Sequence, residues 1–226
     1  MIIASQPRSG THMTRTALNQ HPELEFQSEV LNGIAFSAHW PKDITLDQLL
    51  RNNPNFCMHV YDPIDLEGMW PGWEMQAELQ ERFMREKQDA MVLTRRDKLA
   101  QAVSYIEATM SGQFHTFEEP SNSSLTHCPS WAVMDLIDRF ERADAWTQEA
   151  LPDAPVYLYE DLAMMPDAVF NRMQKHLGVT PRPLRAQTKK LGNRPLHKRV
   201  RNWDLVEKAL MGTRHEHYLE GHRVCY

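Results

Sequence analysis

Residues 2–18, with the sequence IIASQPRSGTHMTRTAL, predict a strand, a tight turn and a helix in immediate succession. The run IIAS at residues 2–5 is apolar with β-branched side chains, which is typical of a buried strand. Pro7 and Gly10 end this run, and apolar residues then recur at helical spacing up to Leu18. Such a turn directs backbone N–H groups and the positive end of the helix dipole toward one spot, which can bind an anion.

The alternation of strands and helices continues along the whole chain. Further strands are expected over residues 55–61, 90–94 and 154–159, and helices over residues 74–87, 97–110, 130–150, 166–177 and from 203 onward. Residues 111–129 show no periodicity and are expected to form a long loop. This alternation predicts an α/β fold with a central, mainly parallel sheet. Because no repeat and no linker divides the chain, we expect a single domain over residues 1–226.

Composition excludes several classes of protein. Of the 226 residues, 24% are charged and 42% are apolar, the balance of a folded globular protein. No apolar run approaches the length of about 18–20 residues that a membrane span needs. The N-terminus lacks the pattern of a secretory signal. Cys57, Cys128 and Cys225 lie far apart, so we expect no disulfide framework, no thiolate zinc site and a cytoplasmic location.

Charge is unevenly distributed along the chain. Eight basic residues and no acidic residue lie between Pro181 and Trp203, namely Arg182, Arg185, Lys189, Lys190, Arg194, Lys198, Arg199 and Arg201. Without these eight of its 25 basic residues, the chain would have 17 basic against 30 acidic residues, a balance of −13. A basic segment on an acidic body favours a compact anionic ligand over a nucleic acid, and a solvated basic loop is the alternative.

The turn after the first expected strand carries groups that can bind an anion. Arg8 adds a cationic side chain, and Gly10 lets the backbone approach a ligand closely. Further hydrogen-bond donors come from Ser9, Thr11 and His12. The pattern GxxxxGK[ST] is absent from this turn, so it favours a metal-free phosphate binder over a magnesium-dependent NTPase. An ordinary strand-to-helix turn is the structural alternative.

A second pair of phosphate-binding groups follows the expected strand at residues 90–94. Arg96 lies just after this strand, at the edge where open α/β sheets bind ligands. Ser104 follows eight residues later, a little over two helical turns away. A guanidinium and a hydroxyl at these positions can bind a phosphate monoester. The alternative is a salt bridge between Arg96 and Asp97 or Glu107 at the start of a helix.

Three segments, each after an expected strand, resemble the sulfotransferase family. They are PRSGT at residues 7–11, RRDKLAQAVSY at 95–105 and YEDL at 159–162. Members of this family use 3′-phosphoadenylyl sulfate (PAPS) as the sulfuryl donor. The longer segment PRSGTHMTRTALNQHPELEFQSEVLN, residues 7–32, is similar to bacterial carbohydrate sulfotransferases. YEDLAMMPDAVFNRMQKHLGV at 159–179 and VRNW at 200–203 also resemble family segments.

The resemblance implies a three-layer α/β fold with a central parallel sheet, of the kind shared with P-loop nucleotide kinases. It implies that Arg8, Ser9, Gly10, Thr11 and His12 surround the 5′-phosphosulfate, with Arg8 stabilising charge on the bridging oxygen. Other relatives commonly have Thr in place of His12.

The resemblance further implies that Arg96 and Ser104 bind the 3′-phosphate. The basic stretch around Lys198, Arg199 and Arg201 would close over the same phosphate, with the choice among these three open. No metal is required for the chemistry that the family performs.

Sulfuryl transfer to a hydroxyl needs one base to remove the acceptor proton. Glu29, in QSEVLN, matches the glutamate of the carbohydrate-type enzymes, and His59, in CMHVYD, lies roughly where the cytosolic small-molecule enzymes carry a catalytic histidine. Glu29 is favoured because its flanking sequence matches. The structural alternatives are a first-turn glutamate for Glu29 and a core histidine for His59.

Other polar groups are interpreted as structural. The segment RHEHYLEGH near the C-terminus has three histidines but lacks HExxH spacing, so a solvated polar tail is expected and no metal site. Glu160 and Asp161 are interpreted as structural in the resemblance. The poorly matched regions include Trp40, Trp70 and Trp73, which could stack on an acceptor.

The acceptor is expected to be a carbohydrate or small molecule bearing a hydroxyl or amine, with no nucleic-acid partner. The rival functions are a nucleotide-dependent kinase, which would need a P-loop lysine and a magnesium ligand, and a non-catalytic nucleotide-binding relative.

Overall fold

The computed structural model describes residues 1–27, 51, 55–66, 73–86, 89–112, 125–186 and 194–222. The described residues fall into two compact units. The first is drawn from residues 1–94 and 142–186, and the second from residues 95–141 and 187–226. We predicted a single domain over residues 1–226, and the division into two compact units does not test that prediction. Among the described helices, none is both long enough and apolar enough to span a membrane.

A parallel sheet forms the centre of the first unit. Its described strands are β1 (Ile2–Ser5), β2 (Phe56–His59), β3 (Ala90–Thr94) and β4 (Val156–Leu158). They lie in the order β2-β1-β3-β4, and every pair is parallel. The chain therefore leaves β1 first toward one side, to β2, and later returns to the other side, to β3. In open α/β sheets, ligands bind outside the carboxyl ends of the strands at such a switch point.

Alternating side chains of the strands form two separate cores, because successive residues of a strand point to opposite faces. Ile2 and Ala4 lie in one core, together with Met84 of α5 (Trp73–Glu86). Ile3 lies in the other, with residues from the helices α1 (Thr11–Leu18), α8 (Tyr159–Met164) and α9 (Pro166–His176). The sheet is thus covered on both faces, and the expected three-layer α/β fold is confirmed for this unit.

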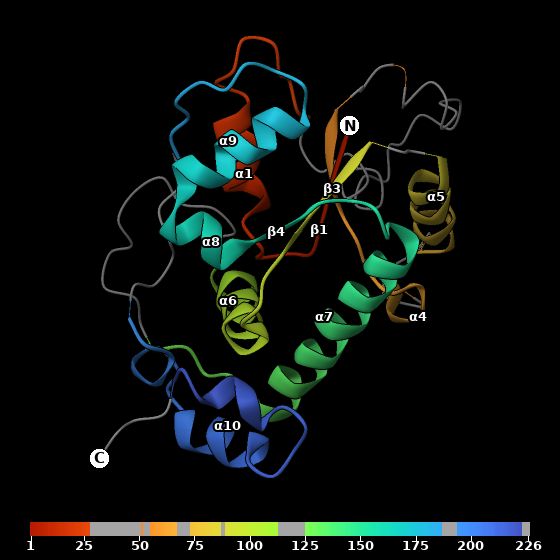
Figure 1. Cartoon of the computed structure of the whole chain (residues 1–226). Helices are drawn as coiled ribbons and strands as arrows, with labels where there is room; N and C mark the ends of the chain where they lie inside the picture. Colours follow the sequence, from red (N-terminus) through yellow and green to blue (C-terminus); the bar gives the residue numbers. More distant parts are fainter. Residues whose placement is uncertain are drawn as a thin grey trace. The chain divides into compact units, whose positions relative to one another are not determined.

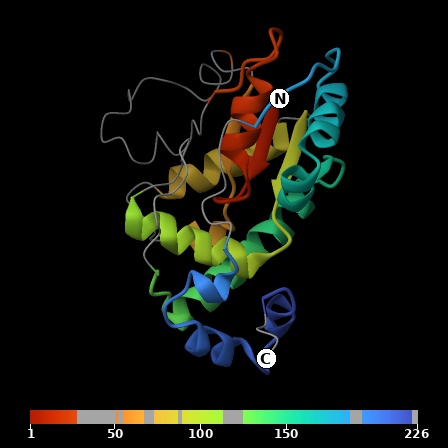
Figure 2. The ribbon, with the colours of Figure 1, turned by 90° about the vertical axis from the view of Figure 1, so that its left-hand side faces the viewer.

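The views of the ribbon show these layers. Helices α1, α8 and α9 lie on one side of the strands and α5 lies on the other (Figure 1). Helix α9 packs against α1, and Figure 2 shows the same elements from the side, with α1 in red and α8 and α9 in cyan. The remaining described helix that lies wholly in this unit is α4 (Pro63–Leu66). Helix α7 (Ser130–Ala150) starts in the second unit and ends in the first.

The boundary between β4 and α8 differs from the sequence-based expectation. A strand was expected up to residue 159, whereas β4 ends at Leu158 and Tyr159 begins α8. Glu160 and Asp161 lie in the first turn of α8, where negative charge stabilises the positive end of a helix dipole. This placement agrees with their interpretation as structural residues.

The second unit is mainly helical. It contains α6 (Lys98–Ser111), the first part of α7, α10 (Trp203–Leu210), and the short helices η1 (Leu196–Lys198) and η2 (Glu216–Leu219). Its core joins apolar residues of all these elements, namely Leu99, Val103, Ile106, Val133, Ile137, Leu196, Val206 and Leu219.

Asn202, just before α10, bonds to a distant segment of the chain and not to the start of its own helix. It stands at the N-cap position of α10, but its side chain makes no capping hydrogen bond. Its amide nitrogen instead donates to the Cys128 carbonyl at 2.8 Å, and its amide oxygen accepts from the Cys128 N–H at 2.9 Å. Asn202 therefore ties two distant segments of the second unit together, as a neighbouring backbone residue in a sheet would.

The start of α6 is fixed by Asp97 and by the C-terminal segment. The Asp97 carboxylate accepts the Ala100 N–H at 2.8 Å and lies 2.8 Å from Nε2 of His222. Burial raises the pKa of Asp97, but the hydrogen bond from His222 opposes it, together with the Ala100 N–H and the charges of His222 and Arg95. The net result is a pKa below the ordinary aspartate value of 3.8.

Replacing His222 by alanine should reduce stability in a pH-dependent way. A lowered Asp97 pKa means that the pair stabilises the folded state above the ordinary aspartate pKa, and that this stabilisation is lost as pH falls through the folded-state pKa. We expect the His222→Ala variant to lose about 1 kcal/mol of unfolding free energy at neutral pH. The difference from the wild type should shrink below about pH 4.

Urea denaturation across the acid range measures this difference. His127→Ala serves as the control, because His127 is an exposed histidine of the same unit. A difference between His222→Ala and the wild type that stays constant down to low pH would contradict the interpretation, since it would assign the loss to packing against Trp203 alone.

Candidate functional site

The turn between β1 and α1 has an unusual backbone. Arg8 has φ of 66° and Gly10 has φ of 91°, both in the left-handed region. A residue with a side chain is rarely found there, and such strain gathers at functional sites. Gly10 is also the N-cap of α1, where no side chain caps the helix. The positive end of this helix therefore faces the turn without a capping side chain, which suits an anionic ligand.

Buried hydroxyl groups hold the turn from within. The Ser9 hydroxyl donates to the Gln6 carbonyl at 2.5 Å, and the hydroxyls of Ser5 and Thr11 lie 2.7 Å apart. Ser9 is fully buried and Thr11 is 5% exposed. These two residues, which the resemblance places around the phosphosulfate, shape the turn through their side chains.

Arg8 and His12 are the half-buried residues of this predicted set, together with Gly10. His12 lies in the first turn of α1, and its Nδ1 is 3.4 Å from the guanidinium of Arg15 one turn later. A second cationic side chain is thus present beside the turn. Sequence reasoning had singled out Arg8 and had not considered Arg15.

Asp144 of α7 joins the ends of two strands next to this turn. Its Oδ1 accepts from Nε2 of Gln6 at 2.5 Å, and the Thr94 hydroxyl lies 2.8 Å from each of its carboxylate oxygens. Gln6 directly follows β1 and Thr94 ends β3, the two strands at the switch point of the sheet. Sequence reasoning missed Asp144. The available signal was its spacing, since it lies four residues after buried Phe140 and three before buried Thr147 on one helix face.

The two candidate bases have different outcomes. His59 is the last residue of β2 and pairs in parallel register with Ser5, so its backbone lies beside the start of the turn. It is half-buried. Glu29 lies outside the described residues, as do Trp40 and Trp70. Trp73 begins α5, but the position of its side chain is likewise outside the description.

The predicted residues for the second phosphate lie in the second unit. Arg96 is exposed just after β3, whereas the neighbouring Arg95 is buried. Ser104 is 8% exposed on α6. The turn after β1 belongs to the first unit, and the binding of one donor molecule by both sets of residues stays a prediction.

The structure distinguishes the three basic residues of the C-terminal segment. Arg199 is 7% exposed and forms an ion pair with Glu107 of α6 through two contacts, one of them 3.2 Å from Nε to Oε1. Lys198 and Arg201 are exposed on either side of it in the chain. Glu107 and Ser104 are three residues apart and share a face of α6. The Arg199 ion pair therefore brings this basic segment to the helix face that carries Ser104.

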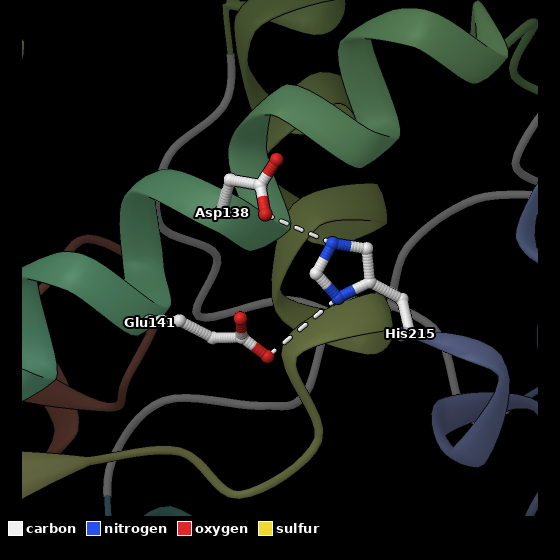
Figure 3. Close-up of side chains that lie close together, drawn as sticks. All are labelled: Asp138, Glu141 and His215. Carbon is white, nitrogen blue, oxygen red and sulfur yellow. Dashed lines mark hydrogen bonds and ion pairs between the residues drawn. The ribbon is translucent and has the colours of Figure 1, made fainter. Parts of the chain in front are cut away.

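A cluster of Asp138, Glu141 and His215 has side chains of the types that bind metals. Figure 3 shows the His215 ring between the two carboxylates of α7. Its Nε2 is 2.9 Å from Asp138 Oδ1, and its Nδ1 is 3.7 Å from Glu141 Oε1. The Tyr218 hydroxyl donates to Glu141 at 2.8 Å, and Arg214 pairs with both carboxylates. The cluster is thus an ion-pair network that already has its own cation, and it anchors the C-terminal segment on α7.

This network corrects one expectation from the sequence. The segment around His215 was expected to be a solvated polar tail, but His215 is 2% exposed and Leu219 is fully buried. The polar residues 214–217 are followed directly by Tyr218 and Leu219, which pack in the core of the second unit. Burial raises the pKa of Asp138, but the hydrogen bonds and charges of Arg214 and His215 outweigh it and lower this pKa below its ordinary value.

Comparison with known proteins finds similarity both in sequence and in structure. No family model matches the chain. It is 24% identical over 234 residues to nodulation protein H of Rhizobium tropici, covering 97% of this chain and 92% of that protein. It is also similar in structure to a sulfotransferase from Alicyclobacillus acidocaldarius, with a TM-score of 0.50, 15% identity and 85% of each chain covered. The structural match agrees with the expected fold.

Replacing Gly10 by alanine should destabilise the first unit more than the same change at Gly178. Both glycines have left-handed backbones, with φ of 91° and 72°. That conformation costs an alanine about 1 kcal/mol. A Cβ at position 10 would also lie 2.9 Å from Cδ2 of Tyr159, whereas nothing lies within 4 Å at position 178. Urea denaturation of the two variants measures the difference, and equal losses would show that the contact with Tyr159 does not limit the turn.

Proposed function

We infer that this chain belongs to the sulfotransferase family, and we propose that it moves a sulfuryl group from PAPS to a hydroxyl or amine of a carbohydrate or small molecule. The observation that carries the proposal is the left-handed turn between β1 and α1, which opens the uncapped start of a helix at the switch point of the sheet. The position, the helix dipole and the cationic Arg8 together suit the phosphosulfate end of the donor.

In this proposal the 5′-phosphosulfate contacts the backbone N–H groups at the start of α1. The hydroxyls of Ser9 and Thr11 keep the turn in shape, and Gly10 leaves room for the ligand. Arg8 offsets the negative charge that develops on the bridging oxygen as the bond to sulfur breaks. His12, in the first turn of α1, lines the same end of the helix.

The 3′-phosphate is proposed to bind in the second unit to Arg96 and Ser104. The basic segment that Arg199 holds against α6 supplies further positive charge. Because the Arg199 guanidinium is committed to Glu107, we assign the phosphate contact to the exposed Lys198 and Arg201. A phosphate with two negative charges favours such a pairing with two cations.

The reaction is an in-line displacement at sulfur. A base takes the proton of the acceptor group, the acceptor oxygen or nitrogen bonds to sulfur, and the bond from sulfur to the bridging oxygen breaks. Adenosine 3′,5′-bisphosphate leaves with the electron pair of that bond. The proposal needs no metal ion, because Arg8 and the helix dipole supply the positive charge. A kinase is not favoured, since the turn lacks the P-loop lysine.

Glu29 is the proposed base, with His59 as the alternative. Glu29 rests on its matching sequence environment. His59 gains support from its pairing with Ser5, which places it next to the turn. We further propose a cytoplasmic location, in line with the few and widely spaced cysteines.

Turnover with labelled PAPS and a panel of sugars, phenols and amines tests the function. We expect sulfated product with at least one acceptor class. The Arg8→Ala variant should lose about 100-fold in kcat, because it removes a charge that acts on the leaving oxygen. Arg85→Ala is the control, since Arg85 is exposed in the last turn of α5. Phosphoryl transfer from ATP with no sulfuryl transfer from PAPS would overturn the proposal.

The choice of base is tested by two conservative variants. Glu29→Gln should lose about 100-fold in kcat while its affinity for adenosine 3′,5′-bisphosphate stays at the wild-type value, because the amide keeps the shape but cannot accept a proton. His59→Gln should keep most of the turnover. The opposite pattern, with loss confined to His59→Gln, would transfer the role to His59.

A further inference from the structure

The Asp144 carboxylate connects the core of the first unit to the turn that is proposed to bind the donor. Two of its partners, Gln6 and Thr94, are 2% and 8% exposed. Gln6 contacts it at 2.5 Å and Thr94 at 2.8 Å. Asp144 itself is half-buried, and its carboxylate holds donors from two neighbouring strand ends in place, because hydrogen bonds to a carboxylate are shorter and stronger than those between neutral groups.

Gln6 links the Asp144 carboxylate to the turn. Its side chain is bound by Asp144, and its carbonyl accepts both the Ser9 hydroxyl at 2.5 Å and the Ser9 N–H at 3.4 Å. Only two residues, Pro7 and Arg8, lie between Gln6 and Ser9. The left-handed backbone of Arg8 is therefore enclosed by a short bridge whose near end is attached to Asp144.

The strained conformation needs such support. A residue with a side chain leaves the left-handed region unless the surrounding structure holds it there. Without the Asp144 contact, the buried side-chain N–H of Gln6 would have no acceptor there. It would then bond to backbone carbonyls that now accept hydrogen bonds within the turn. The turn would then sample other conformations.

We propose that Asp144 is a positioning residue for the donor. It acts through Gln6 to hold the turn at residues 6–10 in the conformation that receives the 5′-phosphate group. This inference rests on the proposed function, because it assigns that group to this turn. Thr94 assists by fixing the carboxylate from the end of β3.

The test separates the contribution of the 5′-phosphate from that of the rest of the nucleotide. Isothermal titration measures the affinity of the wild type and of Asp144→Asn for two probes, adenosine 3′,5′-bisphosphate and adenosine 3′-monophosphate. The ratio of the two dissociation constants reports the contact of the 5′-phosphate with the turn. We expect Asp144→Asn to reduce this ratio about tenfold and to leave the affinity for the 3′-monophosphate within about twofold. A merely structural role would weaken both probes alike.

Three further variants control the interpretation. Asp153→Asn changes an exposed aspartate of the same unit and should leave the ratio unchanged. Gln6→Met combined with Asp144→Asn should lose no more than either change alone, because both act through one contact. If Asp144→Asn does not fold, Thr94→Val removes one donor from the same carboxylate at equal volume and should lower the ratio in the same direction by a smaller factor.

The outcomes separate this inference from the proposed function. A wild type that binds neither probe, or binds both equally, would contradict the assignment of the 5′-phosphate to the turn, and with it the proposed function. A wild type with a large ratio that Asp144→Asn and Thr94→Val both preserve would overturn the positioning role and leave the proposed function in place.

Discussion

The pairing of β1 with strands on both of its edges is the constraint on which the candidate site depends. Ile2, Ile3 and Ala4 are fully buried, and the strand is held by β2 on one side and β3 on the other. The register of β1 cannot shift along either neighbour, because a shift by one residue would move Ile2 and Ile3 to opposite faces of the sheet and so into each other's core. The carboxyl end of β1 is thereby fixed, and so is the origin of the turn that follows it.

From this fixed end, each step along the turn has its own local cause. Gln6 is attached to the sheet through Asp144, and Ser9 is attached to Gln6. Gly10 lies so close to the Tyr159 ring that a Cβ at this position would clash with it. Arg8, the one residue of the turn with a long cationic side chain, is half-buried between these contacts. The chemistry that we propose for Arg8 thus relies on neighbours that never meet the substrate.

Local patterns were sufficient to predict most of the fold. The apolar β-branched runs predicted β1 and β3 to the residue, and the long apolar periodicity predicted α7 over residues 130–150. Where prediction failed, a competing interaction decided. Tyr159 has strand propensity, yet the carboxylates that follow it begin a helix. Asn202 stands at the N-cap position of α10, yet its side-chain amide bonds to the backbone of Cys128, 74 residues away.

The candidate site was predictable only in part, for the same reason. Arg8 and Gly10 belong to a contiguous motif whose position after a strand is visible in the sequence. Asp144 is separated from Gln6 by 138 residues, and its spacing from buried Phe140 and Thr147 indicates an inward helix face but not the partner on it. The buried role of Arg199 likewise needed its partner Glu107, 92 residues earlier. Contacts between residues this far apart depend on how the elements pack in the folded chain, and the local sequence around each residue carries no sign of its partner.

The way the second unit is assembled has a consequence for biosynthesis. Its polar ties join Glu107 to Arg199 and Asp97 to His222, which are 92 and 125 residues apart. When α6 leaves the ribosome, the residues that cover its apolar face have yet to be translated. Val133 and Ile137 of α7 follow soon after α6, whereas Leu196, Val206 and Leu219, which complete the same core, are translated later. Until then part of the apolar face of α6 lacks its partners, and exposed apolar surface favours aggregation of a nascent chain.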